Sequence, residues 1–177
     1  PMPRRSLLHA EKTTLPLNEE QIGLLFAAIT RAAHLDRNAK RDYVLIKGAY
    51  LLGCRVSEIA VIRWQDIEVL DDGGQIHLFG KGSKRRVVRV SSDTLALFEG
   101  LGRGEAEAYV FPSPRGKGHL TRQAIGDVCR KWGREAGFHV HPHQLRHSHA
   151  THAVQRGVDV FTLQATLGHS SSATTGH

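Results

Sequence analysis

A short run near the C-terminal end of the chain concentrates side chains that can handle protons and anions: His141-Pro142-His143-Gln144-Leu145-Arg146-His147. We expect a helix over residues 142–156, ended by Gly157. His143 and Arg146 then lie three residues apart on one side, on the arc that also carries the apolar residues. An inward guanidinium needs an anion or hydrogen-bond acceptors, and its planar fork suits a carboxylate or a phosphate. A structural ion pair or a capping network is the alternative interpretation.

The composition bounds what could supply that anion. With 177 residues, 40% of them apolar, the chain can build one core of ordinary size. A net charge of +7 favours polyanionic partners, with nucleic acid first and an anionic membrane second. There is no run of about 18 apolar residues and no signal-peptide core, so we expect a soluble protein of the cytoplasm. The two cysteines, Cys54 and Cys129, form no disulfide framework, which fits a reducing compartment.

Residue periodicity predicts a mainly α-helical domain with one small antiparallel sheet. Residues 1–16 are basic and lack a clear period, and we interpret them as a linker or arm. Asn18 and Thr121 are placed to cap helices, and Gly53 and Gly137 to end them. The expected helices are residues 19–33, a segment ending at Gly53, residues 55–64, a helix to Leu101 capped by Ser92 or Asp93, and residues 122–136, 142–156 and 160–167. The expected three-stranded meander comprises residues 67–70, 76–79 and 85–90.

Four motifs occur in order along these elements. They are Gly53-Cys54-Arg55-Val56-Ser57-Glu58, Gly80-Lys81-Gly82 between two strands, His143-Gln144-Leu145-Arg146-His147, and Leu167-Gly168-His169. Each motif alone is common. The four in register, with the meander between the first and the third, resemble the tyrosine recombinases, also called the phage integrase family. The similarity is closest to the Xer-like bacterial members and extends from Leu15 to His177.

The resemblance implies the catalytic-domain fold of that family and a role for individual residues. Arg55 and Arg146 would be the two guanidiniums on the scissile phosphate, and His169 would join them as a third donor. Lys81 would be the general acid that protonates the departing 5′ oxygen, and His143 would handle the proton of the nucleophile.

The same resemblance implies the reaction and its partners. In the family a tyrosine attacks double-stranded DNA to give a 3′-phosphotyrosine and a free 5′-OH, without a metal, ATP or a small-molecule substrate. Strand exchange and religation then reverse that step. A multimer is implied for the full-length protein, as a tetramer on DNA, and Glu58 would hold Arg55 in place.

The family pattern also bears on the domain boundaries. It implies that residues 17–177 form the catalytic domain and that the N-terminal core-binding domain of the family is absent from this sequence. The nucleophilic tyrosine of the family would stand at the position directly after His177. We therefore expect the chain to stop one residue before its nucleophile and, as given, to be inactive.

Elementary chemistry supports these roles. A phosphodiester attacked by an oxygen gathers negative charge on its non-bridging oxygens, and without a divalent metal fixed cations must face that charge. Arginine stays charged and offers a planar fork, so Arg55 and Arg146 suit this task. A lysine gives up its proton more readily when buried, which makes Lys81 usable as an acid.

Further polar side chains are candidates for DNA contacts. Lys84, Arg85 and Arg86 follow Lys81 and are either a solvated strand edge or contacts to the DNA backbone. Arg122 and Gln123, at the N-terminus of a predicted helix, are candidate phosphate or base contacts.

Two other functions are open to the sequence. His143 and His147 have the i, i+4 spacing that can hold zinc, although no glutamate lies between them to serve as a base. A non-catalytic DNA-binding or regulatory fragment of a recombinase is the second. We interpret Tyr43, Tyr50 and Tyr109 as structural residues rather than substitute nucleophiles.

Overall fold

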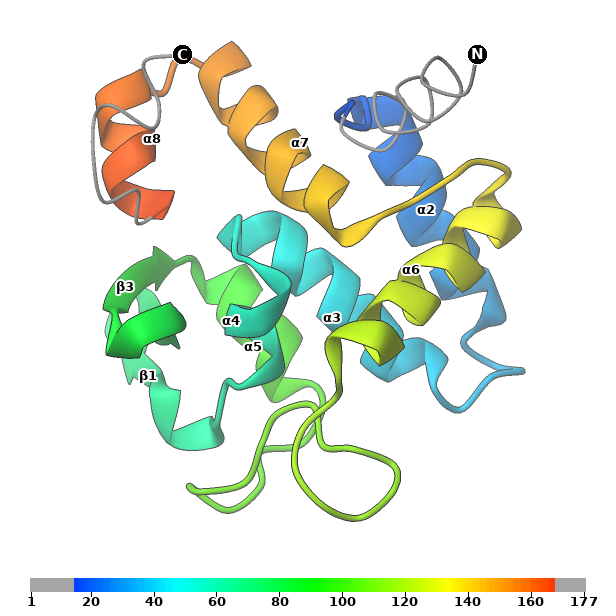
Figure 1. Ribbon diagram of the computed structural model, residues 1–177, viewed down its shortest axis with the longest axis horizontal. Coiled ribbons are helices and arrows are strands. Elements are labelled where there is room, and N and C mark those ends of the chain that lie inside the picture. Colours follow the sequence, from blue (N-terminus) through cyan, green and yellow to red (C-terminus); the bar gives the residue numbers. More distant parts are fainter. Residues whose placement is uncertain (1–14, 168–177) are drawn as a thin grey trace, which may run out of the picture.

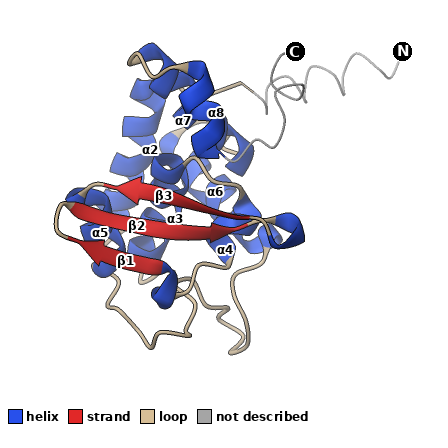
Figure 2. Cartoon of the chain, turned by 90° about the vertical axis from the view of Figure 1, so that its left-hand side faces the viewer, coloured by secondary structure: helices blue, strands red, loops and turns tan. Residues whose placement is uncertain are grey.

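The computed structural model describes residues 15–167, with the side chains of Ser83 and of residues 164–166 excepted. One three-stranded sheet forms one flank of the molecule, and the helices pack behind and beside it (Figures 1 and 2). The elements are α2 (Glu19–Ala32), α3 (Ala39–Leu52), α4 (Val56–Ala60), η1 (Trp64–Asp66), β1 (Ile67–Leu70), β2 (Gly73–Phe79), η2 (Lys81–Ser83), β3 (Arg85–Val90), α5 (Ser92–Glu99), α6 (Arg122–Ala136), α7 (Pro142–Gln155) and α8 (Val160–Leu167). The predicted fold class, mainly helical with a small antiparallel sheet, is confirmed.

Local capping signals set most of the helix boundaries. Asn18 Oδ1 accepts from Gln21 N–H at 2.7 Å where α2 begins, and Thr121 Oγ1 accepts from Ala124 N–H at 3.0 Å where α6 begins. Gly53 ends α3 with a left-handed backbone (φ 61°), a conformation that suits glycine. These boundaries follow the sequence prediction because each depends on residues that are neighbours along the chain.

The third helix is shorter than the sequence predicts. Its periodicity indicates a helix over residues 55–64, but α4 ends at Ala60. Beyond that point the backbone pairs with a distant loop, since Trp64 N–H donates to Ala108 O at 3.1 Å. In a helix over residues 55–64 this N–H would donate to the carbonyl of Ala60, so the tertiary contact replaces the helical one.

The helix after the sheet begins one residue earlier than predicted. Ser91, and not Ser92 or Asp93, supplies the cap, because its Oγ accepts from Thr94 N–H at 3.2 Å. The helix α5 then ends at Glu99, short of the predicted end.

The sheet is the predicted meander, in the order β1-β2-β3 with both pairs antiparallel. The register places Ile76 of β2 opposite Ile67 and Val88, and all three side chains are buried. Along β3 the exposed Arg85 is followed by the partly buried Arg86, which shares the inner face of the strand with Val88. The alternation therefore turns Arg86 toward the interior.

The helix α7 packs on α3 and also contacts the segment before α2 (Figure 1). Leu17 N–H donates to the buried Ser148 Oγ at 2.8 Å. Tyr50 Oη and His152 Nδ1 lie 2.7 Å apart and join α3 to α7. These polar contacts fix the rotation of α7 about its own axis, and so the direction in which its other side chains point.

Two composition-based expectations can be compared with the structure. Within residues 15–167, no helix combines the length and the apolar character needed to cross a membrane. Cys54 and Cys129 are both buried free thiols, and burial raises the pKa of each to about 12. Both thiols therefore stay protonated and contribute only to packing.

We expect Ser148→Ala to lower the free energy of unfolding by about 1–3 kcal/mol, because it leaves the buried Leu17 N–H without its acceptor. Urea unfolding followed by circular dichroism measures the change. Ser92→Ala, at an exposed position of α5, is a matched control and should change stability by less than about 0.5 kcal/mol. Equal stability of the two variants would contradict the anchoring role of Ser148.

Candidate anion-binding site

One buried carboxylate lies at the centre of the candidate site. Glu58 is 2% exposed, and its Oε1 accepts from Arg55 N–H at 2.8 Å, which caps the start of α4. Arg86 of β3 donates from Nε to Oε2 at 3.0 Å and from Nη2 to Oε1 at 3.1 Å. The Nη1 atoms of Arg55 and Arg146 are farther away, each 3.9 Å from Oε1. Three guanidiniums from different parts of the chain thus surround one carboxylate.

Two opposing effects set the pKa of Glu58. Burial raises the pKa of the carboxyl. The hydrogen bonds from Arg86 and from Arg55 N–H, together with the positive charges of Arg86 and Arg146, outweigh burial and hold the pKa below its ordinary value of 4.5. Glu58 is therefore ionised at neutral pH.

Arg146 projects from α7 into the same place and is held by backbone carbonyls. Its Nη1 donates to Gly53 O at 2.8 Å and its Nη2 donates to Leu167 O at 3.3 Å. Burial, followed by the positive charges of Arg55 and Arg86, lowers the pKa of Arg146 to about 10. At neutral pH the guanidinium still carries its charge, in a fixed orientation and with 15% of the side chain exposed.

An open hollow of about 400 Å³ lies beside these groups, bordered by α4, α6 and α7. It brings together three residues predicted to be catalytic, Arg55, His143 and Arg146, and two predicted to contact DNA, Arg122 and Gln123. Its lining residues are Arg55, Val56, Arg122, Gln123, Gly126, Arg130, His141, Pro142, His143 and Arg146. Four of these described lining residues are arginines and none carries a carboxylate, so the hollow favours an anion.

The first turn of α7 presents two histidines to the hollow. His141 caps the helix, since its Nδ1 accepts from His143 N–H at 3.2 Å, and the two rings stack with centroids 5.0 Å apart. Burial, followed by the charges of His143, His139 and Arg130, lowers the pKa of His141. A neutral imidazole keeps Nδ1 available as the capping acceptor, while His143 is exposed on the surface of the hollow.

Lys81 lies on the hairpin between β2 and β3 and is not among the described residues that line the hollow. Its neighbour Gly80 comes close to the site, because a Cβ atom at Gly80 would stand 4.0 Å from Glu58 Oε2. The side chains of Lys81, Lys84 and Arg85 are all exposed. The structure thus brings the residue before Lys81 close to Glu58, while the side chain of Lys81 itself is exposed and lies outside the described lining of the hollow.

Arg86 differs in placement from the other basic residues of its hairpin. The sequence groups it with Lys84 and Arg85 as a strand edge or a DNA contact, but its side chain is only 13% exposed and is paired with Glu58. Strand alternation is the signal that could indicate this, since position 86 shares a face with the buried Val88.

The sequence does not single out Arg130, which also lines the hollow. Arg130 follows Arg122 and Gly126 at spacings of four residues along α6, and residues at this spacing share one face of a helix. That spacing is the signal that could have identified it. Arg130 also pairs with Asp127 on the same helix.

His169 lies outside the described residues, so its predicted role stays a prediction. The phenol oxygens of Tyr43, Tyr50 and Tyr109 are each engaged by another side chain, at 3.0, 2.7 and 2.8 Å respectively. None of the three tyrosines is among the described lining residues of the hollow. These contacts agree with their interpretation as structural residues.

No three His, Cys, Asp or Glu side chains are placed to share a metal ion within residues 15–167. The zinc hypothesis, which started from His143 and His147, therefore finds no complete set of such ligands in that part of the chain.

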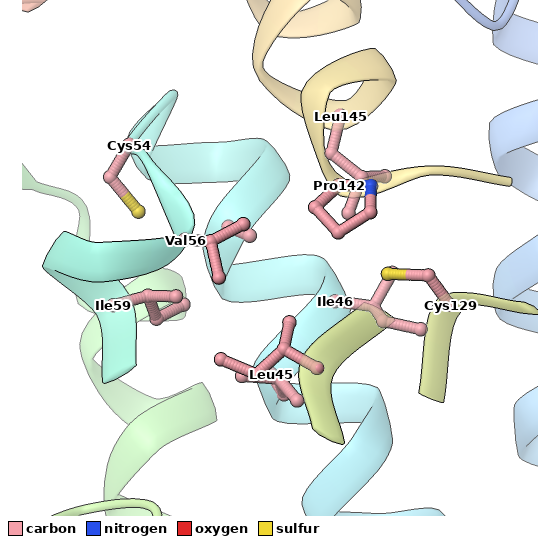
Figure 3. A pocket seen from close by; sticks show the side chains of 10 residues that line it. Leu45, Ile46, Cys54, Val56, Ile59, Cys129, Pro142 and Leu145 are labelled. Atoms are coloured by element: carbon pink, nitrogen blue, oxygen red, sulfur yellow. The ribbon is translucent and has the colours of Figure 1, made fainter. Parts of the chain in front are cut away.

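Apolar packing supports the site from the inside. A cavity of about 10 Å³, barely the size of one water molecule, is lined by side chains from α3, α4, α6 and α7 (Figure 3). Val56 and Pro142 line both this cavity and the cationic hollow, so they form a wall between the core and the surface. Because these residues are packed, the adjoining backbone that carries Arg55 and His143 is held in place.

Comparison with known proteins shows which family this site belongs to. The model of the phage integrase family matches residues 16–177. The chain belongs to the phage integrase family. Tyrosine recombinase XerD of Bifidobacterium longum is 36% identical, over 92% of this chain and 58% of the relative. Tyrosine recombinase XerA of Pyrococcus furiosus is 33% identical, over 92% of this chain and 56% of the relative, so the chain spans little more than half the length of these members.

Solved structures of other family members have the same fold. The crystal structure of the XerH site-specific recombinase, bound to its difH substrate in a pre-cleavage complex, superposes with a TM-score of 0.77 at 25% identity and covers 93% of this chain and 50% of that one. The crystal structure of XerA recombinase gives a TM-score of 0.76 at 25% identity, over 92% of this chain and 59% of that one. The predicted resemblance and fold are thus confirmed.

Glu58→Gln tests how much the buried charge stabilises the fold. Because the pKa of Glu58 is lowered in the folded protein, its contribution is present above the ordinary pKa of 4.5 and is lost as the pH falls through the folded value. We expect the variant to be about 3 kcal/mol less stable than the wild type at neutral pH, since Arg86 loses its buried counter-charge. The difference should shrink as the pH falls below 4.5.

Thermal unfolding of both proteins from neutral pH to about pH 3 measures this difference. Glu99→Gln removes a more exposed ion pair with Arg103 and serves as the control, with an expected loss below about 1 kcal/mol. A stability difference for Glu58→Gln that stays constant over the whole range would contradict the assigned charge.

Proposed function

We propose that residues 17–177, preceded by a linker of residues 1–16, are the catalytic domain of a site-specific DNA recombinase. The domain cuts and rejoins double-stranded DNA through a 3′-phosphotyrosine, without metal or ATP, as part of a multimer of the full-length protein. Membership of the phage integrase family supports this proposal. So do the solved XerH complexes with difH substrates before and after cleavage, which contain a protein of the same fold.

The observation that carries the proposal is the convergence of Arg55, His143 and Arg146 on one hollow. Arg146 is oriented by two backbone carbonyls, so its charge needs no rearrangement when an anion arrives. Fixed donors of this kind stabilise the charge that develops on the non-bridging oxygens as phosphorus is attacked. The site is therefore suited to a phosphodiester in its transition state.

The remaining roles complete one balanced step. The attacking oxygen forms a bond to phosphorus and gives its proton to His143, while the bond from phosphorus to the 5′ oxygen breaks and Lys81 protonates that oxygen. His169 is a third donor to the phosphate. The nucleophile is a tyrosine at the position after His177 in the full-length protein. Glu58 keeps Arg55 in position, through the 2.8 Å contact to its backbone N–H.

The proposed DNA contacts come from α6 and from the hairpin of β2 and β3. Arg122 and Gln123 line it from the N-terminus of α6, where the helix dipole and the unpaired N–H groups favour a phosphate. Lys84 and Arg85 are exposed on the hairpin that carries Lys81 and contact the DNA backbone.

The first test supplies the chain with the C-terminal sequence of its gene and mixes it with a nicked duplex that carries its core site, identified beforehand by binding selection. We expect a protein–DNA adduct that survives SDS, because a phosphotyrosine is covalent. Replacing the tyrosine after His177 by phenylalanine should abolish it. Tight DNA binding without an adduct would favour a non-catalytic DNA-binding or regulatory fragment instead.

The second test is Arg146→Ala in the same protein. The single-turnover cleavage rate should fall by about a hundredfold or more, corresponding to about 3–4 kcal/mol of transition-state stabilisation. The Kd for DNA should change by less than about tenfold, because many other phosphate contacts remain. Arg156→Ala, at the exposed far end of α7, is the control and should change neither quantity. Equal losses in binding and in cleavage would refute a transition-state role.

A further inference from the structure

We propose that Arg86 is a positioning residue of this site, which neutralises Glu58 so that this carboxylate does not compete with a phosphate for the guanidiniums of Arg55 and Arg146. The inference rests on the proposed function, since it concerns how the same hollow binds the scissile phosphate. It gives Arg86 a role different from that of a DNA contact.

The distances distinguish Arg86 from the other two arginines. Arg86 makes two hydrogen bonds to Glu58, at 3.0 and 3.1 Å, whereas the side chains of Arg55 and Arg146 come no closer than 3.9 Å. A paired, two-point contact of this kind is the strong form of the arginine–carboxylate interaction. Arg55 and Arg146 line the hollow and Arg86 is not among its lining residues. Arg86 therefore pairs with the carboxylate of Glu58, whereas Arg55 and Arg146 face the hollow.

The local structure explains why Glu58 needs a cation of its own. Glu58 caps α4 through Arg55 N–H, so the carboxylate has to lie in the site, and at 2% exposure it has to be paired. Without Arg86, the nearest cations would be Arg55 and Arg146. A phosphate would then compete with Glu58 for the same two guanidiniums. Arg86 removes that competition.

The same contact fixes the hairpin that carries the proposed general acid. Arg86 lies on β3, opposite Leu78 of β2, directly after the turn that holds Lys81. Its bond to Glu58 joins this hairpin to α4, and a Cβ atom added at Gly80 would stand 4.0 Å from Glu58 Oε2. Arg86 therefore positions the lysine of the hairpin as well as the two phosphate-binding arginines.

The experiment titrates inorganic phosphate into the 177-residue chain and follows the side-chain N–H resonances of Arg55 and Arg146 by NMR. We expect Arg86→Gln to weaken phosphate binding by about tenfold or more, because Glu58 then pairs with the phosphate-binding arginines. Adding Glu58→Gln to this variant should restore the affinity to within about threefold of the wild type, since it removes the competing carboxylate. Arg89→Gln, on the exposed face of β3 and paired only at the surface with Asp72, is the control and should have no effect.

Each outcome decides a different point. A wild-type chain that binds no phosphate would overturn the proposed function and this inference with it. Wild-type binding that Arg86→Gln leaves unchanged would overturn the inference alone. Should Arg86→Gln fail to fold, the double variant decides by itself. A positioning role predicts nearly normal phosphate affinity for it, whereas a direct phosphate ligand or a merely structural residue predicts a loss that Glu58→Gln does not repair.

Discussion

The site depends on one buried carboxylate that must find a cation. Glu58 lies in the interior because it caps α4, and an ionised carboxylate there is stable only when it is paired. Three guanidiniums lie close to this carboxylate, those of Arg55, Arg86 and Arg146. One carboxylate cannot balance three positive charges, so the surplus acts on the adjoining hollow. Through separate contacts, Glu58 thus caps a helix, joins a hairpin to it and sets the charge of the surface beside it.

Helix geometry adds to this surplus. The first turns of α6 and α7 both border the hollow, through Arg122 and His143. Helix N-termini carry partial positive charge, which favours a bound anion. The apolar wall of Val56 and Pro142 lies behind them and fixes the backbone from which these side chains project. Charge and rigidity therefore come from the same packing of α4, α6 and α7.

The sequence predicts those features that depend on near neighbours. Helix ends follow from caps within three residues, and the types and spacing of Arg55, His143 and Arg146 indicate an anion site in the framework of a known family. The sequence does not predict features that depend on contacts between segments far apart along the chain. The helix predicted over residues 55–64 stops early because a loop far along the chain takes its hydrogen bonds. Strand alternation indicates that Arg86 faces inward, but its pairing with a residue 28 positions away depends on how the sheet packs against α4, which residue types alone do not reveal.

The surplus charge also has a thermodynamic consequence for the folded protein. The pKa of Arg146 is lowered to about 10, by burial and then by repulsion from Arg55 and Arg86, which means that the folded chain holds this charge at some expense in stability. A bound phosphate would relieve the repulsion, and a ligand that binds only the folded state stabilises it. The same positive charges that repel one another in the folded protein therefore favour a bound anion. Fixed cations of this kind stabilise an anion most strongly where negative charge develops.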